Sequence, residues 1–155
     1  MPNDFWSNAD IIDIYTRRQA IEDGVLVQLS GHGYQGDPWV PAMVAEAGFR
    51  YPVAMTATAF CSYVSPLEGD GEELAPCQDI KGRLWDVLWM LKAAIRRIQA
   101  LRAILHFGLR VVPNVPANNY SKPNPPRAKL VHLKAVCGPD DDGSPCLTIM
   151  LPEED

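Results

Sequence analysis

The sequence lacks the features by which several protein classes are recognised. No stretch approaches the ~18 apolar residues that a membrane helix needs, and the first ten residues, MPNDFWSNAD, lack the basic and apolar blocks of a signal peptide. A P-loop, GxSxG and HExxH are all missing. We therefore expect a cytoplasmic protein without a membrane segment, a cofactor or a metal site, and these absences argue against an enzyme.

The sequence also lacks the cysteine spacing of metal and redox motifs. The four cysteines are Cys61, Cys77, Cys137 and Cys146, and no two of them form a CxxC pair. In a cytoplasmic chain they are expected to be reduced, small apolar residues. Cys137 and Cys146 flank one predicted turn, so a disulfide between them remains an alternative in an oxidising compartment.

Acidic residues are missing from a long middle segment. The chain has 14 basic and 19 acidic residues and a net charge of −5. Residues 87–139 hold nine Lys and Arg and no Asp or Glu, which leaves five basic and 19 acidic residues, a charge of −14, for the rest. Such a division indicates either an anion-binding surface or acidic segments that fold over the basic segment and neutralise it.

The most apolar helical pattern lies at residues 81–102, KGRLWDVLWMLKAAIRRIQALR. Its apolar residues recur at steps of three and four, as one face of a helix requires, and they are Ile80, Leu84, Leu88, Leu91, Ile95 and Ile98. Trp85 and Trp89 lie beside this stripe, Asp79 is a suitable N-cap, and an Arg83–Asp86 pair is expected on the polar side. We predict a central core helix near residues 80–101 that is covered on most of its circumference.

The remaining elements predict an α+β fold in a single domain, residues 1–155. Short helices are expected at residues 16–23, 39–47 and 52–64, and alternating apolar residues predict strands at 25–30, 104–112, 129–137 and 146–151. The expected architecture is an antiparallel sheet of three to four strands with about four helices packed on one face. Residues 1–10 read as a loose arm, and 65–79 and 113–127 as long loops.

The outer face of that sheet is a candidate nucleic-acid surface. The candidate residues share a basic character and come from the segment without acids; they are Arg96, Arg97, Arg102, His106, Arg110, Lys129, His132 and Lys134. A base-stacking sheet also needs surface aromatics, and the predicted strip has none. His106 and His132 on neighbouring strands could form an acid–base pair, but Gly108 and Lys134 stand where such two-histidine enzymes carry hydroxyl residues.

The predicted hairpin turn at residues 138–145 is acidic. Asp140, Asp141 and Asp142 precede Gly143, but Gly138 and Ile149 occupy positions that an EF-hand would fill with acids, so calcium binding is not expected. A solvated turn held by Asx hydrogen bonds is the simpler interpretation.

Four segments of the sequence are distinctive when taken together: YTRRQAIEDGVLVQLS, EAGFRYPVAMT, GRLWDVLWML and VCGPDDDGSPCLTIMLPEED. They resemble a family of small bacterial proteins of unknown function found on plasmids, prophages and other mobile elements. The resemblance implies no activity and no catalytic residues. It implies the context of a mobile element, whose small proteins often act by binding.

The first functional hypothesis is a non-enzymatic binding protein, an anti-defence inhibitor of the anti-CRISPR kind, that meets a host protein or nucleoprotein complex. Its contact residues would be acidic, namely Glu68, Asp70, Glu72, Glu73, Asp140, Asp141 and Asp142. The alternative is a nucleic-acid-binding module that uses the basic residues 92–134. A small two-histidine enzyme is the least favoured. The chain is expected to be a monomer or a homodimer, in which Trp6, Trp39 and Tyr120 would form an apolar patch.

Overall fold

The computed structural model describes residues 15–66, 74, 78–100, 102–115, 119 and 122–155. In these ranges the helices are α1 (Arg17–Glu22), α2 (Trp39–Glu46), α3 (Ala57–Tyr63) and α4 (Ile80–Arg97). The strands are β1 (Leu26–Gln28), β2 (Val53–Thr56), β3 (Ile104–Val111), β4 (Lys129–Pro139) and β5 (Pro145–Met150). The predicted α+β class is confirmed. None of the described helices is both long and apolar enough to cross a membrane.

The sheet has five strands in the order β1-β2-β5-β4-β3, and it is mixed. β2 runs parallel to β5, while the other neighbours are antiparallel. The prediction of a three- to four-stranded antiparallel sheet is therefore wrong in its details. β2 was the missing strand, because residues 52–64 were predicted to form one helix.

The segment 52–64 instead changes from strand to helix at Thr56. All four residues of β2 are buried, so its sequence shows no alternation and resembles a helix segment. Thr56 has extended backbone angles, and its side chain accepts a hydrogen bond from the Ala59 amide, so it caps α3.

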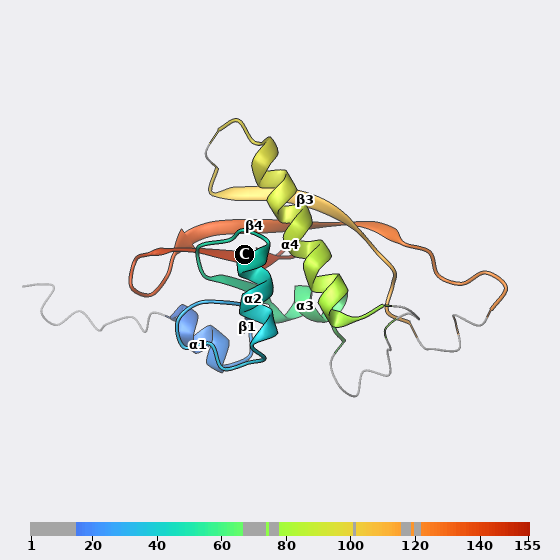
Figure 1. Cartoon of the computed structure of the whole chain (residues 1–155), viewed down its shortest axis with the longest axis horizontal. Helices are drawn as coiled ribbons and strands as arrows, with labels where there is room; N and C mark the ends of the chain where they lie inside the picture. Colours follow the sequence, from blue (N-terminus) through green and yellow to red (C-terminus); the bar gives the residue numbers. More distant parts are fainter. Residues whose placement is uncertain (1–14, 67–73, 75–77, 101, 116–118, 120–121) are drawn as a thin grey trace, which may run out of the picture.

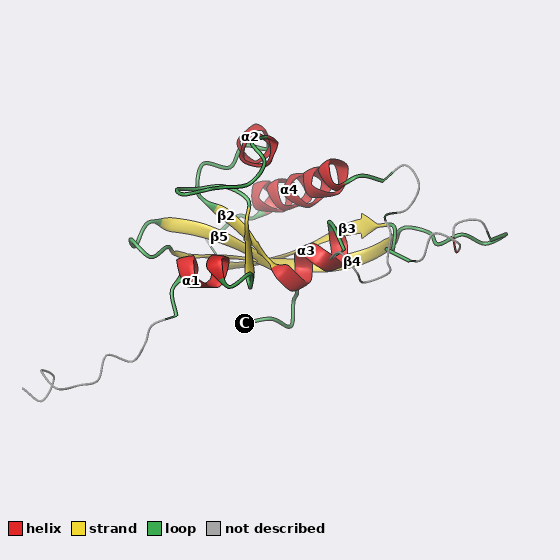
Figure 2. Cartoon of the chain, turned by 90° about the horizontal axis from the view of Figure 1, so that it is seen from below, coloured by secondary structure: helices red, strands yellow, loops and turns green. Residues whose placement is uncertain are grey.

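Helices lie on both faces of the sheet. α2 and α4 pack together on one face, which we call the inner face, and α1 lies on the opposite, outer face (Figure 2). α4 crosses the sheet over β3 and β4 (Figure 1). The expectation that all helices cover one face is corrected, because the hairpin turn of β4–β5 holds α1 on the outer side, as described below.

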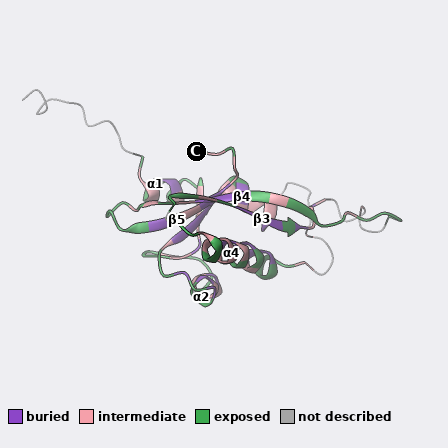
Figure 3. Cartoon of the chain, turned by 90° about the horizontal axis from the view of Figure 1, so that it is seen from above, coloured by how far each residue is buried: buried purple, intermediate pink, exposed green. Residues whose placement is uncertain are grey.

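The predicted alternation of β3 and β4 is confirmed. Phe107, Leu109 and Val111 of β3 and Leu133 and Ala135 of β4 are buried against the inner-face core, and exposed and buried segments alternate along these strands in Figure 3. The register pairs Cys137 with Leu147 and Gly138 with Cys146. Cys137 and Cys146 therefore point to opposite faces, and both are free thiols.

α4 begins as predicted, with the Asp79 carboxylate accepting a hydrogen bond from the Gly82 amide at 2.6 Å. Leu84, Val87, Leu88 and Leu91 are buried, and the helix ends at Arg97, before the predicted residue 101. The prediction that α4 is covered on most of its circumference is wrong, because Asp86, Trp89 and Arg96 on the side away from the sheet are exposed.

Arg83 turns inward from α4 and does not pair with exposed Asp86, contrary to the predicted ion pair. Its side chain is 4% exposed. Its guanidinium donates to Asn114 Oδ1 at 2.5 Å and to the Val112 carbonyl at 2.6 Å. This buried arginine ties α4 to the chain that follows β3.

The C-terminal residues fold back onto the outer face. The Glu154 carboxylate accepts from the Thr56 hydroxyl and from the Leu151 amide, each at 2.7 Å, and its carbonyl accepts from Lys134 Nζ. Together α1 and this tail cover the outer face beside β2 and β5. They leave β3 and the first half of β4 open.

Candidate functional site: an acidic turn and a basic edge

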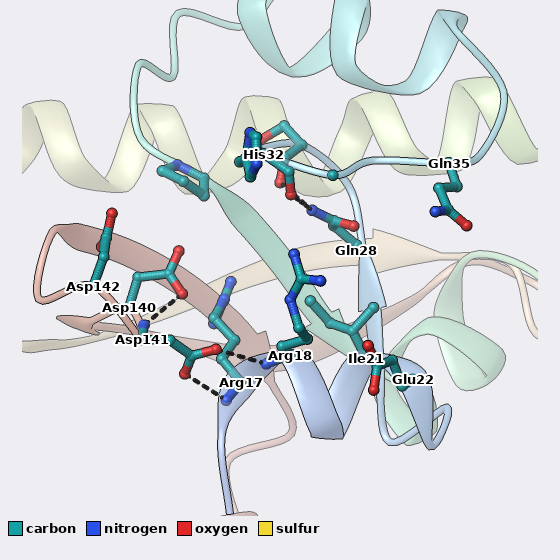
Figure 4. A pocket seen from close by; sticks show the side chains of 14 residues that line it. Arg17, Arg18, Ile21, Glu22, Gln28, His32, Gln35, Asp140, Asp141 and Asp142 are labelled. Carbon is teal, nitrogen blue, oxygen red and sulfur yellow. Dashed lines mark hydrogen bonds between the residues drawn. The ribbon is translucent and has the colours of Figure 1, made fainter.

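The acidic turn after β4 caps the first helix. Asp141 accepts a hydrogen bond from the Arg17 amide at 2.8 Å and another from the Arg18 amide at 2.9 Å, one on each carboxylate oxygen (Figure 4). Thr16 and Gln19 form the predicted capping box. The four amides at the start of α1, which a helix cannot satisfy internally, therefore all have acceptors.

Asp140 and Asp142 hold the turn itself. The Asp141 amide donates to Asp140 Oδ1 at 2.8 Å, and Ser144 donates to Asp142 Oδ1 through its amide at 2.9 Å and its hydroxyl at 2.5 Å. The Ser144 side chain and then its amide lower the pKa of the Asp142 carboxyl. The predicted Asx hydrogen bonds are thus present.

The other predicted acidic contact residues, Glu68, Asp70, Glu72 and Glu73, lie outside the described residues.

A polar pocket of about 500 Å³ opens between α1, the loop after β1 and the acidic turn. The Arg18 side chain points into it, toward the loop that carries His32, while Asp140 and Asp142 stand on another side (Figure 4). Arg17 turns away and donates to Thr148 Oγ1 at 2.6 Å and to the Leu147 carbonyl. In the described part of the chain no group of three His, Cys, Asp or Glu could hold a metal ion.

An apolar pocket of about 430 Å³ lies between β1, the loop that follows it, α2, α3 and the start of α4. Tyr34, Trp39 and Phe60 contribute aromatic rings to it, and Ile80 stands at its rim and is 36% exposed. Lys81 Nζ lies 5.1 Å from the centre of the Trp39 ring. Trp39 is thus half-buried and covered by a cation. The two other residues of the predicted dimer patch, Trp6 and Tyr120, lie outside the described residues.

The open part of the outer face carries the predicted histidines. The register pairs His106 with Lys134 and Gly108 with His132, so the histidines are diagonal neighbours. An added Cβ at Gly108 would lie 3.5 Å from His132 Nδ1, which places the His132 ring over this glycine. His106, Arg110 and His132 are exposed there, but Lys134 is only 8% exposed and is bound by the tail. Lys129 is also exposed, but it pairs with Val111 and so belongs to the inner face.

The remaining predicted cations lie near the end of α4. Arg96 and Arg97 form its last turn, and Arg102 precedes β3. All three are exposed, and no carboxylate within the described ranges pairs with them or with Arg110. Since β3 is an edge strand, exposed cations occupy both faces of the sheet along one edge. We call Arg96, Arg97, Arg102, Arg110 and Lys129 the basic edge.

Two tryptophans stack on the solvent side of α4. The ring centroids of Trp85 and Trp89 are 5.6 Å apart and the rings are 21° from parallel. Trp85 is partly buried against the core, whereas Trp89 is 47% exposed. Arg96 follows Trp89 by seven residues, two helical turns, and so shares its side of the helix.

Residues 1–155 match the model of a family described only as a family of unknown function (DUF6573). The chain belongs to this family. No curated protein and no solved structure matches it. Membership of this family implies no activity. The acidic turn, the basic edge and the exposed Trp89 are the features of the structure that bear on function.

Sequence reasoning missed the contributions of Arg18 and Trp89. The sequence places Arg18 only in a short helix, because the acidic turn on another side of its pocket lies more than a hundred residues further along the chain. The exposure of Trp89 could have been predicted from the sequence. On a helical projection Trp89 falls between the polar residues Asp86 and Arg96 and away from the leucines that face the core.

Proposed function

We propose that this protein is a non-enzymatic nucleic-acid-binding protein and that its basic edge contacts phosphates. One observation carries the proposal: five exposed cations lie in the last turn of α4, on β3 and beside the two ends of β3, and none of them pairs with a carboxylate among the described residues. Unpaired arginines in the last turn of α4 also interact favourably with the helix dipole. That role accounts for Arg96 and Arg97, but it does not account for Arg102, Arg110 or Lys129.

The distribution of charge is compatible with a net charge of −5. The described acidic turn lies at the end of β4 that is away from Arg110 and Lys129, and it is bound to α1. Phosphate binding depends on local charge, because exposed charges farther apart than about 8 Å are largely screened at physiological salt. A nucleic acid bound at the end of β3 that carries Arg110 and Lys129 would therefore meet these cations and be screened from that turn.

The test is a titration of labelled single-stranded DNA, duplex DNA and RNA, followed by fluorescence anisotropy across a salt series. Each phosphate contact contributes about 0.7 to 0.9 to the slope of log K against log salt. The double variant Arg96→Glu/Arg97→Glu changes the basic edge on the inner face of the sheet, and the single variant Arg110→Glu changes it on the outer face. Arg50→Glu, an exposed arginine between α2 and β2, is the matched control.

The expected result is salt-dependent binding whose slope falls in the α4 variant and in the Arg110 variant but not in the control. If no oligonucleotide binds at low salt, or if binding is insensitive to salt, the proposal is wrong.

The anti-defence hypothesis is a second candidate, supported by the pocket beside the acidic turn. Asp140 and Asp142 line a concave surface of about 500 Å³ that a basic side chain of a partner protein could enter. The protein would then come from a mobile genetic element and occupy a host surface meant for phosphates. Asp140→Lys should abolish such a complex. A host complex that survives this charge reversal would exclude this form of the hypothesis.

A further inference from the structure

We infer that Trp89 is a stacking platform for an unpaired base, which makes single-stranded nucleic acid the ligand of the surface around it. This inference rests on the proposed nucleic-acid binding and adds a base contact to its phosphate contacts. It concerns the solvent side of α4, defined by Trp85, Trp89, Lys92 and Arg96.

The geometry of the tryptophan pair carries the inference. Trp85 is partly buried against the core and stacks on one face of the Trp89 ring at a centroid distance of 5.6 Å. The 47% exposure of Trp89 therefore belongs to its other face and its edges. A large aromatic side chain kept in water is unfavourable, and helix stabilisation by a contact four residues apart does not require an open ring face. The outer face is oriented before a ligand arrives, which lowers the entropic cost of binding.

Cations flank this ring on the same helix. Lys92 is held in place, because its ammonium donates to the Gly48 carbonyl at 2.9 Å and lies 5.3 Å from the Phe49 ring. Arg96 is exposed two turns, ~10 Å, beyond Trp89. A ring with cations at its side is the arrangement by which proteins bind single strands, with bases on the ring and phosphates on the charges.

The same features disfavour two other ligands of the surface around Trp89, a second copy of this chain and a nucleic-acid duplex. A second copy of this chain would place Lys92 and Arg96 against their own counterparts, and like charges repel. A duplex keeps its bases stacked inside, so a ring on the convex surface of a helix cannot reach their faces without unstacking them.

The experiment compares an oligonucleotide of about 12 nucleotides with an abasic oligonucleotide of the same length, which keeps the phosphates and has no bases. Anisotropy gives both affinities, and intrinsic tryptophan fluorescence reports stacking. We expect Trp89→Ala to weaken binding of the base-bearing strand by roughly five- to a hundredfold and to leave abasic binding unchanged. Trp89→Phe should retain most of the affinity.

Tyr51→Ala removes an exposed aromatic side chain from a loop, 53% exposed in the native protein, and is the matched control. Circular dichroism of each variant verifies its fold. If wild-type protein binds both strands equally and Trp89→Ala changes neither affinity, the stacking inference is overturned while phosphate binding stands. If neither strand binds, the proposed function itself fails.

Discussion

Replacing Asp141 with alanine should destabilise the protein through α1, which starts more than a hundred residues earlier in the chain. Both carboxylate oxygens of Asp141 accept amide hydrogen bonds, from Arg17 at 2.8 Å and Arg18 at 2.9 Å. The substitution leaves those two amides to water and removes a negative charge from the positive end of the helix. α1 has six residues, too few to persist in water without tertiary contacts.

Loss of a capping side chain costs about 0.5–2 kcal/mol. Asp141 caps two amides but is exposed, so we expect a loss of about 1–2 kcal/mol in the free energy of unfolding, near the upper half of that range. For a chain of this size the corresponding decrease in Tm is roughly 2–8 °C. Amide exchange in α1 should accelerate by roughly five- to thirtyfold, because the helix opens locally before the whole protein unfolds.

Urea unfolding and hydrogen exchange of the same samples measure the two quantities. Asp142→Ala is the matched control, since it removes an acid from the same turn whose carboxylate binds Ser144 and not α1. Asp141→Asn keeps one acceptor oxygen, so its free energy of unfolding and its amide exchange in α1 should lie between those of the wild type and of Asp141→Ala. Unchanged exchange in α1 in the Asp141→Ala variant, or an equal acceleration in both alanine variants, would refute the assignment of Asp141 as a cap.

Three further predictions concern other parts of the fold. Gly31→Ala should destabilise the protein by about 1–3 kcal/mol in urea unfolding, because Gly31 has φ 112° and an added Cβ would lie 2.8 Å from Pro52 Cβ. Arg83→Met should cost about 2–4 kcal/mol in the same assay, since it removes the buried hydrogen bonds to Asn114 and to a backbone carbonyl. The lowered pKa of Asp142 means that its contribution to stability is complete above the ordinary Asp pKa and is lost as the pH falls through the lowered value. Asp142→Asn should therefore reduce the stability lost between roughly pH 6 and about pH 3, measured by urea unfolding at both values.

Local sequence signals predicted the elements that depend on neighbouring residues. The capping box at Thr16, the N-cap at Asp79 and the alternation of β3 and β4 were all predicted correctly, because each needs residues no more than a few positions apart. β2 was missed for the complementary reason. It pairs with β1 on one side and β5 on the other, is buried throughout, and thus has neither the helical nor the strand period.

The candidate site was harder to predict, because the partners of its charged residues are distant in the sequence. Lys134 alternates with inward-facing Leu133 and Ala135 and so reads as an exposed cation. The carbonyl of Glu154, twenty residues later, binds its ammonium on the outer face. Asp141 likewise reads as a solvated acid, yet its partners are the amides of Arg17 and Arg18. No local pattern in either segment encodes these contacts.

The arrangement of β3 decides how the predicted basic residues can act together. Arg110 is on the outer face of an edge strand, whereas Arg96 is on the helix that covers the inner face. A single phosphate cannot touch both, so binding by one face and binding around the edge make different predictions. If the bound nucleic acid contacts only α4, Arg110→Glu will leave the affinity of the protein for nucleic acid unchanged. The Trp89 surface alone will then explain binding. If the nucleic acid passes around the β3 edge, substitutions on either face of the sheet will lower the slope of log K against log salt. Each substitution then removes separate phosphate contacts.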